Sequence, residues 1–301
     1  MNSSTDGEYI AHYLEYAAAG IFSIAGLTVQ SFIIAMIISD RLKGGLMTAV
    51  DQIIFSLGLS RFVFHFLSLW RILYIAFFTT IPKILYIILT IIGNTSAFSN
   101  IWLSVLLSVV LTLKISTFHN GIILHLKLII LHRIMHLLAA SVLLSLGCAS
   151  FYFVMVNVIF VKHSENSTSD NISNEGENSA NSVVIVWLLV FLVIYFLSTA
   201  LLIIPLCLHL KRIKSDDNLT CRVDTYIKTI TFIIMSFLMC AAYIIFTATN
   251  KFDINLSVAG MFIIWNVFPL SHSVFLIYAI AKLRSHFVQI FQQKNKCFFS
   301  R

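Results

Sequence analysis

Charged side chains are scarce in this sequence. Asp, Glu, Lys and Arg together make up 11% of its 301 residues, whereas hydrophobic residues make up 59%. A soluble domain usually carries about 25% charged residues, so much of this surface must face a solvent other than water. We therefore predict a protein embedded in a lipid bilayer.

Proline and glycine are also few, with 3 and 11 residues. The apolar runs are long and do not alternate with polar residues, which excludes the strands of a membrane barrel. An apolar run of about 20 residues can cross a hydrocarbon core of about 30 Å as a helix. The sequence predicts an all-α membrane protein, a single seven-transmembrane helix bundle with spans near 12–38, 46–75, 83–113, 134–160, 183–209, 227–249 and 258–281.

The start of the chain has no basic residue. It contains Asp6, Glu8 and Glu15, whereas a cleavable signal peptide begins with positive charge, so the first apolar run is predicted to be a retained helix. The segments that join the spans then alternate between acidic and basic. By the positive-inside rule this pattern predicts an extracellular N-terminus and a cytoplasmic basic tail at 282–301, in a multi-pass protein of the plasma membrane.

One predicted outer segment, 161–182, is polar, acidic and rich in Asn and Ser. It contains two glycosylation sequons, at Asn166 and Asn171, on the side predicted to be extracellular. We therefore predict a glycosylated second extracellular loop.

No Asp or Glu lies deep in a predicted span. Proton-coupled carriers and cation channels usually need such groups, so their absence disfavours both classes. Hydrolase motifs are also missing, and His132 and His136 have no Cys or carboxylate nearby to complete a metal site. We predict no enzyme activity, no cofactor, no metal and no nucleic-acid partner.

Arg61 lies near the middle of the second predicted span. An unpaired arginine costs a few kcal/mol at that depth, so its side chain should face the bundle and meet hydrogen-bond acceptors. Gln30, His272 and Ser273 lie at comparable depth in their own spans. These residues predict a polar core, which could transmit a signal or simply lock the packing.

Aromatic residues are abundant in the outer halves of the later spans. Such residues can line a mostly apolar pocket for small amphipathic ligands, although most aromatic side chains in a bundle serve only packing or face lipid. The predicted pocket residues of this kind are Phe98, Trp187, Tyr195, Tyr243, Phe262 and Trp265.

Four motifs narrow the interpretation. They are Leu57-Gly58-Leu59-Ser60-Arg61; Trp102 with Leu113-Lys114-Ile115-Ser116; the 201–209 segment LLIIPLCLH; and the 269–277 segment PLSHSVFLI followed by Lys282-Leu283-Arg284. In order and spacing they resemble the type 2 taste receptors, the bitter receptor family, whose members are G-protein-coupled receptors. The sequence departs from that family's pattern at Gln30, His65, Ala97, Ile280 and Arg222-Val223, so we expect a divergent member.

The resemblance implies a chemoreceptor that binds small, bitter molecules and activates a heterotrimeric, gustducin-like G protein. It places Asn94 and Ala97 with the pocket residues, and Trp102 with the structural core. The residues it places toward the G protein are Lys114, Ser116, His209, Lys211, Lys228 and Lys282. A basic inner face would also attract anionic membrane lipids.

Two alternatives stay open. A vomeronasal type 1 receptor shares the architecture and also detects small molecules, although its motifs in helices three and seven differ. A seven-span ligand-gated channel would have the reverse topology, with its N-terminus in the cytoplasm.

Overall fold

The computed structural model describes residues 3–77, 82–115, 121–166, 220–249 and 257–299, together with separate residues between Val186 and Cys207. All regular secondary structure in these residues is helical. The helices are α1 (Ser3–Leu42), α2 (Ala49–Phe77), α3 (Lys83–Ile115), α4 (Gly121–His132), α5 (Ile134–Asn166), α7 (Thr220–Thr249), α8 (Val258–Ala279) and α9 (Ala281–Phe299).

Five of these helices contain segments long and apolar enough to cross a membrane, in agreement with the predicted helical membrane bundle. The segments are Tyr13–Leu42, Ala49–Ile75, Lys83–Leu111, Ile134–Val154 and Val258–Ala279. A shorter apolar segment, Ile230–Ala242, lies within α7. Only separate residues of the predicted span 183–209 are described, and α7 contains only the shorter apolar segment, so seven crossings remain a prediction.

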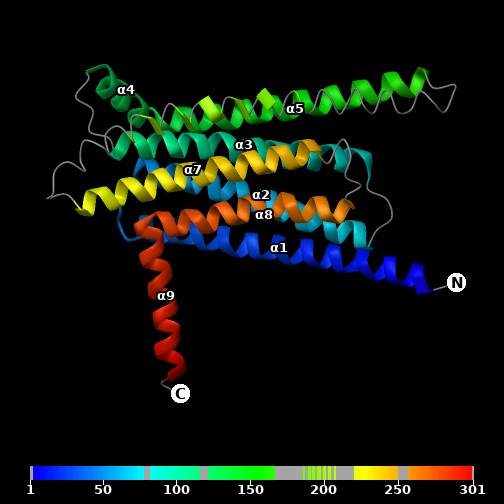
Figure 1. The fold of residues 1–301 in the computed structure, drawn as a ribbon, viewed down its shortest axis with the longest axis horizontal. Helices are drawn as coiled ribbons and strands as arrows, with labels where there is room; N and C mark the ends of the chain where they lie inside the picture. Colours follow the sequence, from blue (N-terminus) through cyan, green and yellow to red (C-terminus); the bar gives the residue numbers. More distant parts are fainter. Residues whose placement is uncertain are drawn as a thin grey trace.

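The long helices pack side by side in one bundle (Figure 1). α1 packs against α2 and α8, and α3 packs between α2 and α5. The turn between α1 and α2, the start of α7 and the junction of α8 with α9 gather at one end of the bundle, opposite the N-terminus. Gly44 has a φ of 85° in that turn, a backbone conformation that glycine adopts without strain.

The interior of the bundle follows from helical periodicity. On α2, the residues Leu57, Arg61, His65, Ser68 and Ile72 are all buried. Their spacing of three or four residues places them on one face. Two basic residues therefore share this inward face with apolar ones.

The outer faces of the helices are apolar. Ile21 is 66% exposed, Leu143 67% and Val274 52%, and all three lie within the membrane-crossing segments. In water such a surface would be unfavourable, whereas in lipid it is the expected one.

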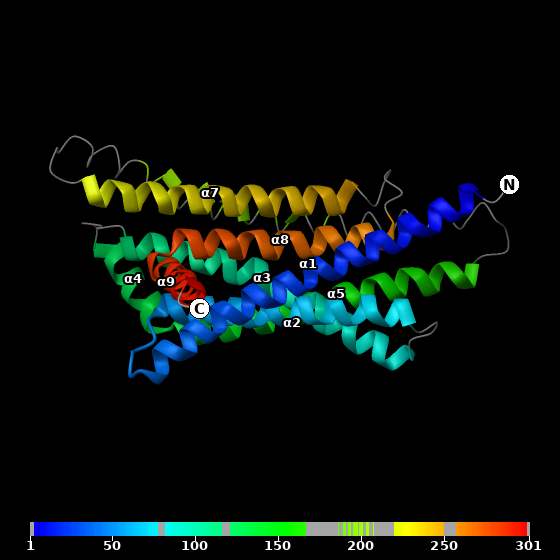
Figure 2. The ribbon, with the colours of Figure 1, turned by 90° about the horizontal axis from the view of Figure 1, so that it is seen from below.

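Two helices occur where the sequence predicted only connections or a tail. α4 lies in the basic segment after α3, and α9 occupies most of 282–301. α9 runs at right angles to the bundle (Figures 1 and 2). In addition, α5 continues beyond the predicted end of its span, to Asn166.

Candidate functional site: a buried polar network beside a small cavity

Arg61 lies at the centre of a buried hydrogen-bond network. Its side chain is fully buried, and its Nη1 donates to Ser273 Oγ at 2.7 Å. Its Nη2 is 3.2 Å from Ser104 Oγ and 2.9 Å from His272 Nδ1. Among the described residues no carboxylate pairs with this guanidinium; neutral oxygen and nitrogen acceptors bind its two terminal nitrogens, and its Nε is buried without a partner.

The hydrogen bonds of Arg61 fix the tautomer of His272. A guanidinium has only donors, so His272 Nδ1 must accept, and the ring proton then lies on Nε2. His272 Nε2 is 2.6 Å from Ser236 Oγ and therefore donates to it. Ser236 Oγ in turn is 2.9 Å from the hydroxyl of Tyr195. The network thus extends from α2 through α8 and α7 to Tyr195.

On the other side, the network reaches α1. Gln30 Nε2 donates to Ser273 Oγ at 2.7 Å, and Ser273 Oγ donates to the Pro269 carbonyl at 2.9 Å. The structure therefore brings Gln30, Arg61, His272 and Ser273 together, as the sequence predicted. Sequence reasoning did not find Ser104 and Ser236, and it had placed Tyr195 in the ligand pocket.

A second polar cluster lies closer to the end of the bundle that holds the N-terminus. His65 Nδ1 is 2.7 Å from Asn266 Oδ1, and Asn266 Nδ2 donates to Ser68 Oγ at 2.6 Å and to the Phe262 carbonyl at 2.7 Å. The amide oxygen can only accept, so the His65 proton lies on Nδ1. The imidazole ring also lies against Gly26, where an added Cβ would be 2.4 Å from the ring.

Sequence reasoning missed Asn266, although a signal was present. Asn266 precedes Ser273 by seven residues, which is two helical turns and hence the same face of α8. His65 likewise follows Arg61 by one turn. Polar residues repeated at helical spacing within an apolar span indicate a face turned toward the protein interior.

A small cavity of about 10 Å³ lies between α2, α3 and α8. Its volume is enough for about one water-sized group. The lining residues are Phe64, Ala97, Asn100, Ile101, Trp265, Phe268 and Pro269. Two predicted pocket residues, Ala97 and Trp265, are therefore among them.

The structure places the other predicted pocket residues elsewhere. Phe98 is buried with Ala149, in a cluster that also includes the predicted core residue Trp102. Phe262 packs in a cluster with Ala19 and Ile72, and its ring meets that of Trp265 edge to face at 5.8 Å. Asn94 is half-buried on α3. The side chains of Trp187 and Tyr243 lie outside the described residues.

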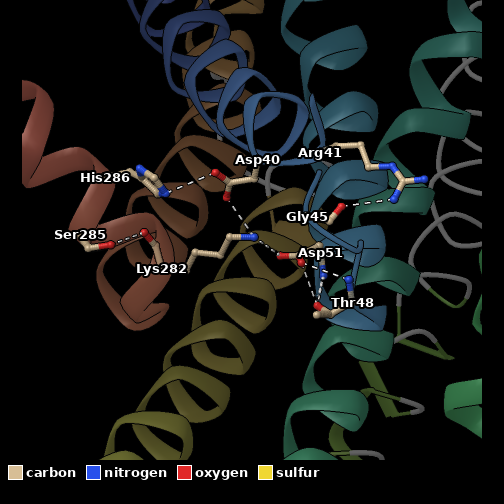
Figure 3. Close-up of polar contacts among 8 residues, drawn as sticks. All are labelled: Asp40, Arg41, Gly45, Thr48, Asp51, Lys282, Ser285 and His286. Atoms are coloured by element: carbon tan, nitrogen blue, oxygen red, sulfur yellow. Dashed lines mark hydrogen bonds and ion pairs between the residues drawn. The ribbon is translucent and has the colours of Figure 1, made fainter. Parts of the chain in front are cut away.

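An ion cluster at the opposite end from the N-terminus joins α1, α2 and α9 (Figure 3). Lys282 Nζ is 3.1 Å from Asp40 Oδ2 and 3.2 Å from Asp51 Oδ1. Asp51 also accepts from the backbone N–H and hydroxyl of Thr48, which caps α2, and His286 Nε2 is 3.5 Å from Asp40 Oδ1. Desolvation lowers the pKa of Lys282, but its hydrogen bonds to the two carboxylates outweigh that effect and raise the pKa above its ordinary value.

Lys282, one of the predicted G-protein-facing residues, thus forms ion pairs with Asp40 and Asp51. Lys228 is half-buried on α7. The side chain of Lys114, and the residues Ser116, His209 and Lys211, lie outside the described part of the chain. So do the predicted glycosylation site Asn171 and the side chain of Asn166, whose backbone forms the last residue of α5.

The family model described as "Taste receptor protein (TAS2R)" matches residues 11–295 of this chain. The chain belongs to the type 2 taste receptor family. This confirms the resemblance seen in the motifs, and it identifies a sensory G-protein-coupled receptor family rather than an enzyme family.

Individual taste receptors agree with this assignment. The chain is 27% identical over 286 residues to "Taste receptor type 2 member 46" of Macaca mulatta, which covers 90% of this chain and 91% of that protein. It is 26% identical over 281 residues to "Taste receptor type 2 member 4" of Rattus norvegicus, with 90% and 91% covered. It is 31% identical over 208 residues to human "Taste receptor type 2 member 43", with 65% and 66% covered. Family membership favours a bitter-taste chemoreceptor in a membrane over the vomeronasal and channel alternatives.

Proposed function

We propose that this taste receptor binds small bitter molecules in an outward-facing helical pocket and activates a heterotrimeric, gustducin-like G protein. In this proposal the chain crosses the plasma membrane seven times, with its N-terminus outside and its tail in the cytoplasm. The observation that carries the proposal is the Arg61 network, which connects α1, α2, α3, α7 and α8 through side-chain hydrogen bonds in the bundle interior.

The network suits a receptor because it joins helices that must move relative to one another. A ligand changes a conformational equilibrium only through a difference in its affinity for the two states. Hydrogen bonds among several helices give the bundle discrete arrangements that such a difference can favour. The cavity beside Ala97 and Trp265 lies against three of the networked helices, α2, α3 and α8.

Pro269 adds to this argument. It lies inside α8 and lines the cavity, and its carbonyl accepts from Ser273 Oγ. Proline has no N–H, so the carbonyl one turn earlier loses its helical partner and α8 can bend there more easily. A ligand beside Pro269 could therefore act on the same part of α8 that holds Ser273 and His272.

The end of the bundle that contains Lys282 is the proposed cytoplasmic face. We propose the roles named from the sequence for the pocket residues and for the G-protein-facing residues, Lys228 and Lys282 among them. Because Lys282 is engaged by Asp40 and Asp51, its part is to hold α9 in place. α9 exposes Phe287 and Val288 close to basic residues, a surface suited to the boundary with anionic lipid.

The proposal is tested by a calcium-release screen of bitter compounds in cells that express the chain with a gustducin-type Gα subunit. We expect at least one compound to give a concentration-dependent response that needs both the chain and the Gα subunit. A response that persists without the Gα subunit, or a current carried by the purified chain alone, would contradict it.

The proposed orientation has its own test. An epitope attached to the N-terminus should be stained on cells that have not been permeabilised, whereas one attached to the C-terminus should be stained only after permeabilisation. The opposite pattern would place the Lys282 end outside the cell and would exclude coupling to a G protein at that end.

A further inference from the structure

Asn100 is the polar residue in an otherwise apolar cavity. The other residues of the lining are aromatic or aliphatic, Phe64, Trp265 and Phe268 among them. Asn100 is only 3% exposed, and its Oδ1 is buried without a hydrogen-bond partner among the described residues. A buried carbonyl oxygen normally has a partner, because it loses its hydrogen bonds to water on burial. The unused acceptor therefore indicates a place for a donor from outside the chain.

Asn100 also lies next to the Arg61 network along α3. Ser104 is one helical turn further along α3, and its Oγ donates to the Asn100 backbone carbonyl at 2.6 Å. The same Oγ accepts from Arg61 Nη2. Ala97, Asn100 and Ser104 are spaced by three and four residues, so they share one face of α3. A group that binds Asn100 is thus one turn from the centre of the network.

We propose that Asn100 determines ligand specificity by accepting a hydrogen bond from an O–H or N–H group of the agonist. This inference rests on the proposed function and names the agonist class for its site: an aromatic or otherwise apolar molecule with one small donor group. A cavity of about 10 Å³ has room for that donor group alone, so the body of the molecule would lie outside the cavity.

The burial of Asn100 Oδ1 explains why the donor group matters. An agonist that presents a methyl group or an ether oxygen to Asn100 would leave Oδ1 buried and unpaired. A neutral hydrogen bond of this kind corresponds to about a tenfold difference in affinity. Discrimination of about tenfold between a donor and its methylated analogue is therefore the expected signature.

The test uses matched compounds in the calcium-release assay. Aromatic alcohols are each applied beside their own methyl ethers, to the unchanged receptor and to Asn100→Leu, which keeps the branched shape of asparagine without its polar atoms. Ser96→Ala is the matched control, because Ser96 is also buried on α3 but its Oγ donates to the carbonyl of Ile92 in its own helix. Surface staining of each variant corrects for expression.

We expect the unchanged receptor and Ser96→Ala to prefer alcohols over their ethers by about tenfold. In Asn100→Leu the alcohol should lose that advantage, while the response to the ether stays near its original concentration range. The retained ether response shows that the variant is folded.

Three outcomes would overturn the inference: no preference for alcohols in the unchanged receptor, a preference that survives in Asn100→Leu, or an equal loss of both responses. The last would indicate that Asn100 holds only a water molecule or serves packing. Failure of the proposed function is distinct, because the unchanged receptor would then respond to no compound of the screen although a control receptor in the same cells does.

Discussion

Arg61 and Ser273 are joined by a hydrogen bond of 2.7 Å between two side chains that are both fully buried. The Ser273 hydroxyl accepts from Arg61 and Gln30 and donates to the Pro269 carbonyl, which uses all of its hydrogen-bonding capacity. Three helices, α1, α2 and α8, therefore depend on one oxygen atom, and loss of any partner changes the environment of the others.

Replacement of Arg61 tests the network directly. In Arg61→Ala, Ser104 and His272 lose their donor, and each buried unsatisfied group costs about 1–3 kcal/mol. We expect agonist-driven calcium release to be abolished. The response should be divided by the amount of receptor at the cell surface, with Arg41→Ala as the comparison, because Arg41 is an exposed arginine at the end of α1. A normal response from surface-expressed Arg61→Ala would refute the role of the network.

The contact between Gly26 and His65 gives a test of packing. In Gly26→Ala the new Cβ would lie 2.4 Å from the His65 ring, so the ring must move and its hydrogen bond to Asn266 must weaken. Overpacking of this kind costs about 1–3 kcal/mol. We expect a lower unfolding temperature for the purified receptor in detergent.

The same measurement has a built-in control and a rescue. Gly20→Ala should leave the unfolding temperature nearly unchanged, because nothing lies within 4 Å of an added Cβ there. His65→Ala should remove the difference between glycine and alanine at position 26. If Gly26→Ala is as stable as the unchanged receptor, the close approach of the two helices is not required.

The two carboxylates around Lys282 predict a role for this residue in placing α9. Lys282→Met removes both ion pairs but keeps an unbranched side chain of similar length. Since the ammonium is partly exposed, each pair contributes about 0–1 kcal/mol, and the effect should be local. We expect faster amide hydrogen exchange across the first turns of α9, with the exchange of α2 and α3 unchanged.

Arg284→Met is the matched variant for that experiment, because Arg284 is also basic and donates to the Tyr278 carbonyl instead of an acid. The sign of the pH effect follows from the raised pKa of Lys282. The stability that the Lys282 ion pairs give to α9 is fully present below the ordinary pKa of lysine. It is lost as the pH rises through the raised pKa. Exchange in α9 that is the same in Lys282→Met and in the unchanged receptor would argue against an anchoring role.

The glycosylation prediction concerns 161–182. If this segment is extracellular and Asn166 carries a glycan, Asn166→Gln should migrate faster on a denaturing gel and reach the cell surface in smaller amounts. Treatment with a glycosidase should remove the difference in mobility. Unchanged mobility in both Asn166→Gln and Asn171→Gln would count against the extracellular placement.

Long apolar runs made most of the described spans predictable. The predicted run 83–113 agrees with α3, Lys83–Ile115, and the run 258–281 with α8, Val258–Ala279. Such runs are informative because the bilayer thickness fixes the length of helix that must be apolar. Arg61 was predictable as a core residue for a related reason, since a charge at that depth needs partners within the protein.

The partners themselves were only partly predictable. Depth along a span can be counted from the sequence, but the rotation of each helix about its axis depends on packing against its neighbours. Gln30 and Ser273 could therefore be predicted from their depth, whereas Ser104, Ser236 and Asn100 could not. The helix α9 was missed because its composition is polar, although Leu283 and Phe287 are spaced by one turn and indicate an apolar face.

The guanidinium of Arg61, near the middle of the segment Ala49–Ile75, is a charge inside the electric field of the membrane. Carrying one charge across the whole field is worth about 2.3 kcal/mol per 100 mV, so a displacement of about a tenth of the thickness gains only about 0.2 kcal/mol. That is well below thermal energy. The resting voltage of a cell would thus hardly alter the balance between arrangements of this bundle, and chemical contacts must set it.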